Sequence, residues 1–205
     1  MKSIMSLKVL KVVLIISIIT IFVSCSNKFS DYHTITLNYD VNYLDTESAY
    51  NIDNIVFKPI KDFIMLPENY LNEFKLNHQS EINEYFIESP LIVYADSLSQ
   101  MLIISNLSSN ILSNNDLFLN SLEYYKNIYQ DNVLRALPFR YNKYLFNQFV
   151  ISYGDNILVK SIFTNLKNNK SQNVFMVDYL LLRDNFAEKM LSVESSIASI
   201  GQSEN

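Results

Sequence analysis

The spacing of apolar residues after position 50 predicts two short strands followed by a helix. The apolar runs 55–57 and 63–66 have strand length, and each is followed within two residues by a proline. The second of these prolines, Pro67, suits the first turn of a helix. Tyr70 and Phe74 would then lie on one face of that helix, one turn apart.

A hairpin and a longer helix are predicted next. The apolar segments 91–95 and 101–105 have strand length, and the polar residues 96–99 between them favour a turn. Residues 113–116 are polar in the manner of a helix N-cap, and apolar side chains follow at intervals of four and three. These side chains belong to Phe118, Leu122, Tyr125 and Tyr129.

The last part of the chain predicts three strands and a closing helix. The strands are expected at 145–153, 157–165 and 173–183, and a tight turn at 154–156 joins the first two. The helix begins at 185–188, where an asparagine and a glutamate have capping-box spacing. Its apolar stripe has the same intervals and consists of Phe186, Met190, Val193 and Ile197.

The predicted strands are apolar on both faces, which decides the fold class. In the last strand, Val174 and Met176 alternate with Phe175 and Val177. Such a strand must be covered on both faces, and hairpin connections make its sheet antiparallel. The sequence therefore predicts an α+β fold in which an antiparallel β-sheet is covered by helices as an α/β/α sandwich.

The order of these elements is similar to that of the Mog1/PsbP-like fold, which is seen in many small bacterial lipoproteins. The resemblance spans residues 53–200 and includes the extended segment 63–67, with Tyr70 three positions after its proline. A C-terminal helix with a Ser-Ile step is a further common feature, here at 196–197 or 199–200. The chain departs from the pattern in Arg140-Tyr141-Asn142, where the glycine usual before the central hairpin is missing. A helix-in-sheet arrangement of the cystatin or NTF2 type is the alternative.

The first 25 residues resemble a bacterial lipoprotein signal peptide. A basic stretch precedes the apolar run 12–23, and the lipobox-like 22–25 ends in the only cysteine of the chain. This run of twelve residues is too short to cross a bilayer core, which needs about 20 residues as a helix. It suits the hydrophobic region of a cleavable signal. An uncleaved membrane anchor or a buried helix is the alternative.

The resemblance implies that Cys25 is lipidated, with a thioether-linked diacylglycerol and an amide-linked acyl chain. Several chains would make the anchor permanent, because each buried methylene adds about 0.8 kcal/mol. Ser26 after the cysteine is compatible with the outer membrane of a diderm bacterium. The expected organisation is a signal peptide (1–24), a lipidated N-terminus and tether that leads into a first strand or irregular arm (25–50), a single α+β domain (51–201) and a flexible tail (202–205).

Charge and composition exclude several classes of function. Without residues 1–24, the chain keeps 13 basic and 21 acidic side chains, so its formal charge is 13 − 21 = −8. Nucleic acid is therefore not expected as a partner, since its binding needs positive charge. With Cys25 lipidated, no thiol is left for a disulfide or a thiolate metal site, and no cofactor is expected. Asparagine is expected to form turns in place of glycine, which occurs only twice.

No catalytic constellation is recognisable in the sequence. His33 and His78 have no partner at metal-ligand or catalytic spacing and are expected on the surface. Neither a Gly-x-Ser-x-Gly elbow nor a His-Glu-x-x-His motif occurs. The adjacent serines 195–196 are expected on the surface of a helix, and two carboxylate pairs in polar sequence are expected to be solvated. These pairs are Asp45 with Glu47 and Glu81 with Glu84.

Tyr124 is the one candidate contact residue. Tyr125 and Tyr129 belong to the predicted core stripe, whereas Tyr124 lies on a different face of the helix, and tyrosine is enriched at interfaces. The expected function is that of a lipid-anchored, non-catalytic docking or accessory module of the cell envelope with a protein partner. The alternatives are a small-ligand carrier and an envelope hydrolase whose site is assembled from distant residues.

Overall fold

One large sheet dominates the computed structural model, which describes residues 32–47, 49–52, 55–78, 86–109, 114–165 and 174–200. Within these residues the strand order is β1-β7-β8-β9-β10-β6-β5-β4. Neighbouring strands are antiparallel except β1 and β7, which run parallel. The strands are β1 (His33–Thr34), β4 (Ile64–Met65), β5 (Phe86–Ala95), β6 (Met101–Ser109), β7 (Val133–Tyr141), β8 (Tyr144–Tyr153), β9 (Asn156–Asn165) and β10 (Val174–Leu182). A separate hairpin pairs β2 (Tyr50–Ile52) with β3 (Ile55–Phe57).

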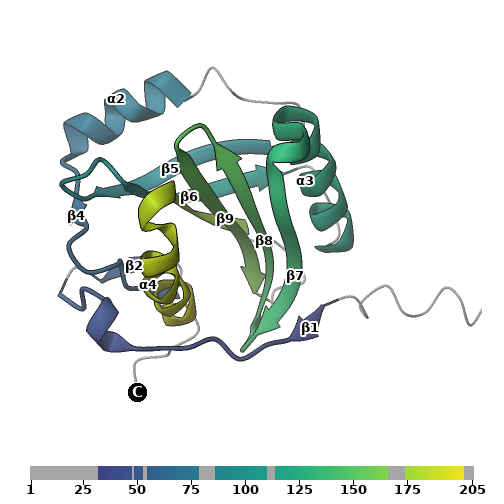
Figure 1. Cartoon of the computed structure of the whole chain (residues 1–205), viewed down its shortest axis with the longest axis horizontal. Helices are drawn as coiled ribbons and strands as arrows, with labels where there is room; N and C mark the ends of the chain where they lie inside the picture. Colours follow the sequence, from purple (N-terminus) through teal and green to yellow (C-terminus); the bar gives the residue numbers. More distant parts are fainter. Residues whose placement is uncertain are drawn as a thin grey trace, which may run out of the picture. The chain divides into compact units, whose positions relative to one another are not determined.

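Helices cover both faces of the large sheet (Figure 1). α3 (Asn114–Tyr129) packs on β7 and β8, and α4 (Phe186–Ser199) packs on β10 and β3 on the opposite face. α2 (Glu68–His78) lies beside β5. Short 3-10 turns in the described segments are η1 (Val41–Tyr43), η3 (Gln130–Asn132) and η4 (Arg183–Asn185). The described residues therefore form the α+β fold that the sequence predicts, with a mostly antiparallel sheet between helical layers.

The larger hydrophobic core lies between α4 and the sheet. Four phenylalanine rings follow one another across β7 to β10, with 4.9 to 5.7 Å between successive centroids. They belong to Phe139, Phe146, Phe163 and Phe175. α4 adds the buried side chains of Val193 and Ile197. Each aromatic pair of this kind adds about 0.5–1.5 kcal/mol beyond its buried area, so the row stabilises the pairing of these four strands.

A smaller core lies between α3 and the opposite face of the sheet. Leu117 and Tyr125 of α3 are buried against Phe149, Ile162 and Met176. The Tyr125 ring lies 4.9 Å from the ring of Phe149, centroid to centroid, and its hydroxyl donates to Sδ of Met176 at 3.7 Å. The placement of Tyr125 in the core, as the stripe predicts, is confirmed.

Strand β7 is absent from the sequence-based prediction, which places three strands after the long helix where the structure has four. Arg135 and Arg140 interrupt its apolar pattern, and Pro138 lacks a backbone donor. Proline is tolerated here because β1 pairs with β7 only through Phe139 and Arg140 among the described residues, so Pro138 lies at an edge. The hairpin of β5 and β6 was predicted, but both strands are longer than expected.

Asparagine replaces glycine at one of the two central hairpins. Asn142, between β7 and β8, has a φ of +51°, in the left-handed region where asparagine is the best substitute for glycine. The hairpin of β8 and β9 turns at Gly154, whose φ is +57°, and the predicted tight turn is confirmed.

The arm of residues 32–50 is packed against the rest of the domain from Tyr32 onward. Tyr32 and Leu44 are buried, and the Asp40 side chain caps η1 by accepting from the Asn42 N–H at 2.9 Å. The predicted lipidation site, Cys25, lies outside the described residues. Within the part of the chain that the structure describes, no helix has the length and hydropathy needed to span a membrane.

Two expectations about α4 are wrong. Asn185 makes no capping hydrogen bond, because η4 precedes the helix and holds Asn185 in a helical conformation (φ −94°, ψ −6°) instead of the extended one that a cap needs. Ser195 and Ser196 are buried rather than on the surface, since the arm and β3 cover that side of the helix. The predicted stripe is confirmed by the burial of Val193 and Ile197, with Phe186 and Met190 partly buried.

Candidate functional site

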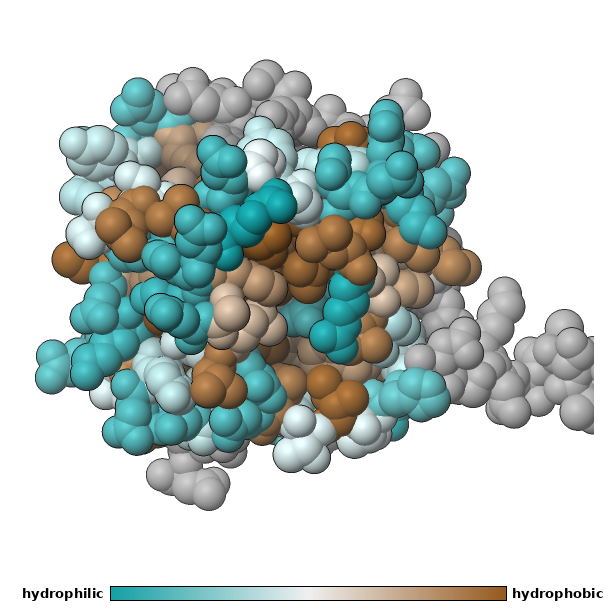
Figure 2. All heavy atoms as spheres, viewed as in Figure 1, coloured by the Kyte–Doolittle hydropathy of each residue, from teal (hydrophilic) through white to brown (hydrophobic). Residues whose placement is uncertain are grey.

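A groove opens on the α4 side of the sheet, between α4, the arm, and the strands β7 and β8. Its volume is about 220 Å³. Figure 2 shows this face, where hydrophobic residues gather over β7 and β8 beside the more polar surface of α4. The apolar lining includes Ile35, Leu37, Leu137, Phe139, Val193 and Ile197. The groove is therefore a largely apolar recess that adjoins the main core.

The groove exists because α4 is held over β10 and β3 and leaves the β7 edge of the sheet uncovered. Two buried serines fix the helix to the residue after β3. Ser196 Oγ donates to the Lys58 carbonyl at 2.8 Å, and Ser199 Oγ accepts from the Lys58 N–H at 2.9 Å. Both backbone groups of Lys58 are thus satisfied by one helix face, which sets the position of α4 along the sheet.

The arm forms one wall of the groove and is also bonded to α4. Ser195 Oγ accepts from the Asp40 N–H and donates to the Asn38 carbonyl, both at 3.2 Å. Glu194 Oε1 accepts from the Asn38 N–H at 2.7 Å. These bonds hold the segment that carries Ile35 and Leu37 against the helix, so contacts within the chain fix this wall of the groove.

Four polar side chains line the groove: Thr36, Arg135, Gln148 and Glu194. Gln148 Nε2 donates to Ser161 Oγ at 3.3 Å, and Glu194 accepts from the arm, so both are already bonded. Arg135 is exposed, and its side chain has neither a hydrogen bond nor an ion pair with any described residue. The set contains no nucleophile activated by a base. Its chemistry suits an apolar group that lies beside an anion.

The candidate contact residue Tyr124 lies far from this groove in the architecture, on the other side of the sheet. It is half-buried, its ring lies 5.1 Å from that of Tyr125, and it packs on the smaller core under α3. Its role as a contact residue stays a prediction. The structure therefore does not bring the one contact residue suggested by the sequence together with the groove.

The histidines and carboxylates singled out in the sequence are also dispersed. His33 is exposed in β1, as expected, and His78 is the last residue of α2. Asp45 Oδ1 accepts from the Glu47 N–H at 3.0 Å, a local turn. The pair at 81 and 84 lies outside the described residues. In the described ranges, no three His, Cys, Asp or Glu side chains gather as metal ligands.

The groove residues on β7 were missed because the strand itself was not predicted. The signal that could have found them is the short apolar run 136–139, which is consistent with a strand that contacts both cores, since Leu137 and Phe139 pack on the larger core and Ala136 on the smaller one. The arginines on either side weaken that pattern. Side chains from β7 therefore line the groove, although no motif in the sequence of this strand indicates a site.

Comparison with known proteins does not assign this chain to a family. No protein-family model matches the chain, and no curated protein matches it. Inferences about function therefore rest on the groove and on the residues that form it.

Proposed function

We propose that this chain is a lipid-anchored, non-catalytic docking module, which binds an extended segment of a cell-envelope protein in the groove beside α4. The groove carries the proposal, because it combines an apolar floor with an arginine, Arg135, whose side chain has no partner among the described residues. The polar groups of the lining include no nucleophile activated by a base, which argues against the alternative of a hydrolase.

The size of the groove favours a side chain over a carried small molecule. Pockets for drug-sized ligands measure about 300–1,000 Å³, whereas this groove measures about 220 Å³. An apolar cavity of about 150 Å³ holds a benzene ring. The groove therefore has room for one aromatic or large aliphatic side chain, and a larger ligand would stay mostly in water.

The charge and the open strand edge define the chemistry of the partner segment. Arg135 favours a carboxylate next to the apolar side chain, because a guanidinium binds carboxylates through paired hydrogen bonds. Beyond the two residues paired with β1, the outer edge of β7 at 133–138 pairs with no other described strand. An extended peptide can add to such an edge through main-chain hydrogen bonds while alternate side chains enter a pocket. The proposed occupant is therefore an extended peptide with a large apolar residue beside Asp or Glu.

Membrane anchoring and the finer fold belong to the same proposal. The basic stretch, the short apolar run and Cys25 support lipidation, with the outer membrane of a diderm bacterium as the location. The order of strands and helices supports a Mog1/PsbP-like topology. The usual role of proteins with that fold, docking or assembly, agrees with the groove.

A displayed library of random peptides tests the groove. The full-length protein in detergent serves as bait, and the dissociation constants of the selected peptides are measured by fluorescence polarisation. We expect the peptides to share a large apolar residue next to Asp or Glu. Leu137→Asp places a charge in the groove and should weaken their binding by about tenfold or more.

Charge reversal separates recognition from folding. Arg135→Glu should change the preferred neighbour of the apolar residue from an acid to Lys or Arg, whereas Lys61→Glu, an exposed reversal outside the groove, should change nothing. Binding of the selected peptides to a folded Leu137→Asp variant at wild-type strength would refute the proposal. Saturable binding of a fatty acid, lost in Leu137→Asp and with no peptide selected, would show a carrier instead. Self-association lost in that variant would show a second copy as the occupant.

A further inference from the structure

A lysine and an aspartate form an ion pair inside the sheet, on the face covered by α3. Lys160 of β9 lies directly opposite Asp178 of β10, and its ammonium donates to Oδ2 of that carboxylate. Phe149 lies opposite Lys160 on β8 and belongs to the core under α3. Only 8 % of Lys160 and 4 % of Asp178 are exposed. Both charges are therefore held in the middle of the sheet, with little access to water.

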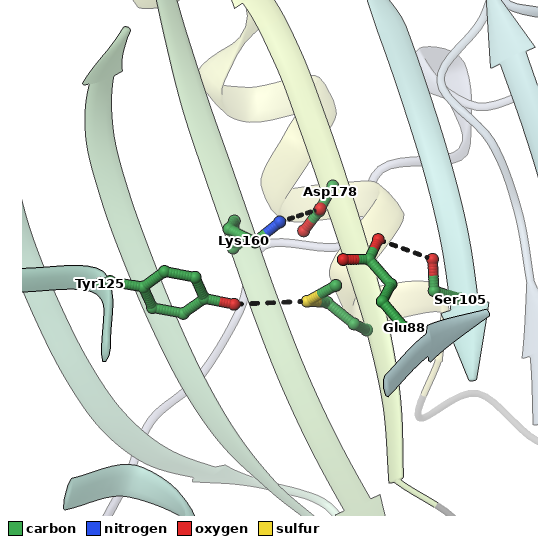
Figure 3. Close-up of polar contacts among 6 residues, drawn as sticks. Glu88, Ser105, Tyr125, Lys160 and Asp178 are labelled. Atoms are coloured by element: carbon green, nitrogen blue, oxygen red, sulfur yellow. Dashed lines mark hydrogen bonds and ion pairs between the residues drawn. The ribbon is translucent and has the colours of Figure 1, made fainter. Parts of the chain in front are cut away.

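Aromatic and apolar groups lie around the pair (Figure 3). The Lys160 ammonium is 5.7 Å from the centre of the Tyr125 ring, and the Tyr125 hydroxyl is engaged with Met176. A second carboxylate, Glu88, accepts from Ser105 Oγ at 3.1 Å, and its negative charge raises the pKa of both members of the pair. The negative charge of Glu88 thus favours a bound proton on the lysine as well as on the aspartate.

The ion pair is poorly satisfied. The second oxygen of Asp178, Oδ1, is buried and has no hydrogen-bond partner in the described part of the chain. Burial raises the pKa of Asp178 to about 7, although the Lys160 ammonium acts in the opposite direction. The attraction between two buried charges offsets the free energy of their lost hydration only when their remaining hydrogen-bonding sites also have partners. A reaction that removes both charges would therefore relieve an unfavourable state.

We propose that Lys160 and Asp178 condense to an intramolecular isopeptide bond that cross-links β9 to β10. The register of the two strands holds the amine and the carboxyl group together, and well-oriented intramolecular partners react as if present at about 10⁵–10⁸ M. The product is a neutral amide in place of two buried charges, and exclusion of water protects it from hydrolysis. The bond lies on the face opposite the groove and does not depend on the docking function.

The reaction needs no co-reactant. The proton of the ion pair passes from Lys160 Nζ to Asp178 Oδ2, which leaves a neutral amine and a carboxylic acid. The lone pair of Nζ then forms a bond to Cγ of Asp178, as desolvated lysines do in nucleophilic catalysis. A proton moves from the nitrogen to the Oδ2 hydroxyl, and the Cγ–Oδ2 bond breaks with its electron pair on the departing oxygen. One amide and one water are formed, and nothing is oxidised or reduced.

Peptide mapping of the denatured full-length chain by tandem mass spectrometry tests the bond. Trypsin does not cleave after an acylated lysine, so the cross-linked protein should give one species that joins residues 144–167 to residues 171–183. Its mass should be one water less than the sum of the two peptides. Recovery of 144–160 and 171–183 as separate peptides, with no joined species, would overturn the proposal.

Two lysine variants complete the test. Lys160→Arg keeps the positive charge but removes the amine, and the joined species should disappear. Lys126→Arg, an exposed position on α3, should leave its yield unchanged. The digest of the wild-type protein shows whether the isopeptide bond is present, even if Lys160→Arg folds poorly. A joined species that persists in Lys160→Arg would place the link elsewhere and overturn the assignment.

Discussion

Truncation of Ile197 tests how α4 packs on the sheet, on which the shape of the groove depends. Ile197 is 2 % exposed and belongs to the larger core, so Ile197→Ala removes most of a buried aliphatic side chain. Substitutions of this kind cost about 2–5 kcal/mol, against a total stability of about 5–15 kcal/mol. One side of Ile197 borders the groove, where fewer contacts are lost. We therefore expect a cost of about 3 kcal/mol, within the lower half of that range.

Urea unfolding followed by circular dichroism gives the measurement. With a slope of about 2 kcal/mol per molar urea, a loss of about 3 kcal/mol lowers the midpoint by about 1.5 M. Leu191→Ala is the matched control, because Leu191 lies on the same helix but is 44 % exposed. Its free energy of unfolding should change by less than about 0.5 kcal/mol. Equal midpoints for the two variants would show that α4 is not docked through Ile197 and would refute the reasoning.

Two further predictions concern the N-terminus and the buried tyrosines. Cys25→Ala should abolish lipid labelling and move the protein out of the membrane fraction, and normal processing of that variant would rule out the anchor. Burial raises the pKa of Tyr125 and Tyr179 above the usual value of about 10. Because only the unfolded state then releases these protons, the contribution of these two tyrosines to stability should be constant below about pH 10 and fall above it. Urea midpoints that stay constant as the pH is raised from about 10 to 11 would contradict this.

The elements that the sequence predicts correctly are those whose burial leaves a regular pattern. β8 and β9 are covered on both faces, so most of their positions are buried and apolar residues occur on both faces, which makes strands of that length recognisable. The stripe of α4 is recognisable because the helix has one face on the core, where Val193 and Ile197 are buried. The hairpin between β8 and β9 follows from Gly154, the only residue there that takes a left-handed turn without strain.

The polar contacts of α4 could not be predicted in the same way. Ser192, Ser195, Ser196 and Ser199 have the helical spacing i, i+3, i+4, i+7 and are all buried. A search for apolar stripes passes over this face, although a stripe of small hydroxyl side chains is also typical of a helix packed against backbone. Partners such as the backbone of Lys58, which follows β3, lie more than a hundred residues earlier in the chain. Sequence spacing alone cannot identify such partners.

The ion pair in the sheet shows how two charged residues could have been used to predict the pairing register of β9 and β10. Lys160 and Asp178 are the only charged residues of β9 and β10, and neither is among the candidates predicted from the sequence. Each charge buried alone would cost several kcal/mol, on the order of the desolvation penalty for one ion. A register in which they lie opposite each other offsets part of that cost. The structure has this register, whereas a shift by two residues would place Asp178 beside Ile162 or Leu158. Two charges that must meet therefore specify how β9 and β10 pair, even though the connecting residues between the strands give no such information.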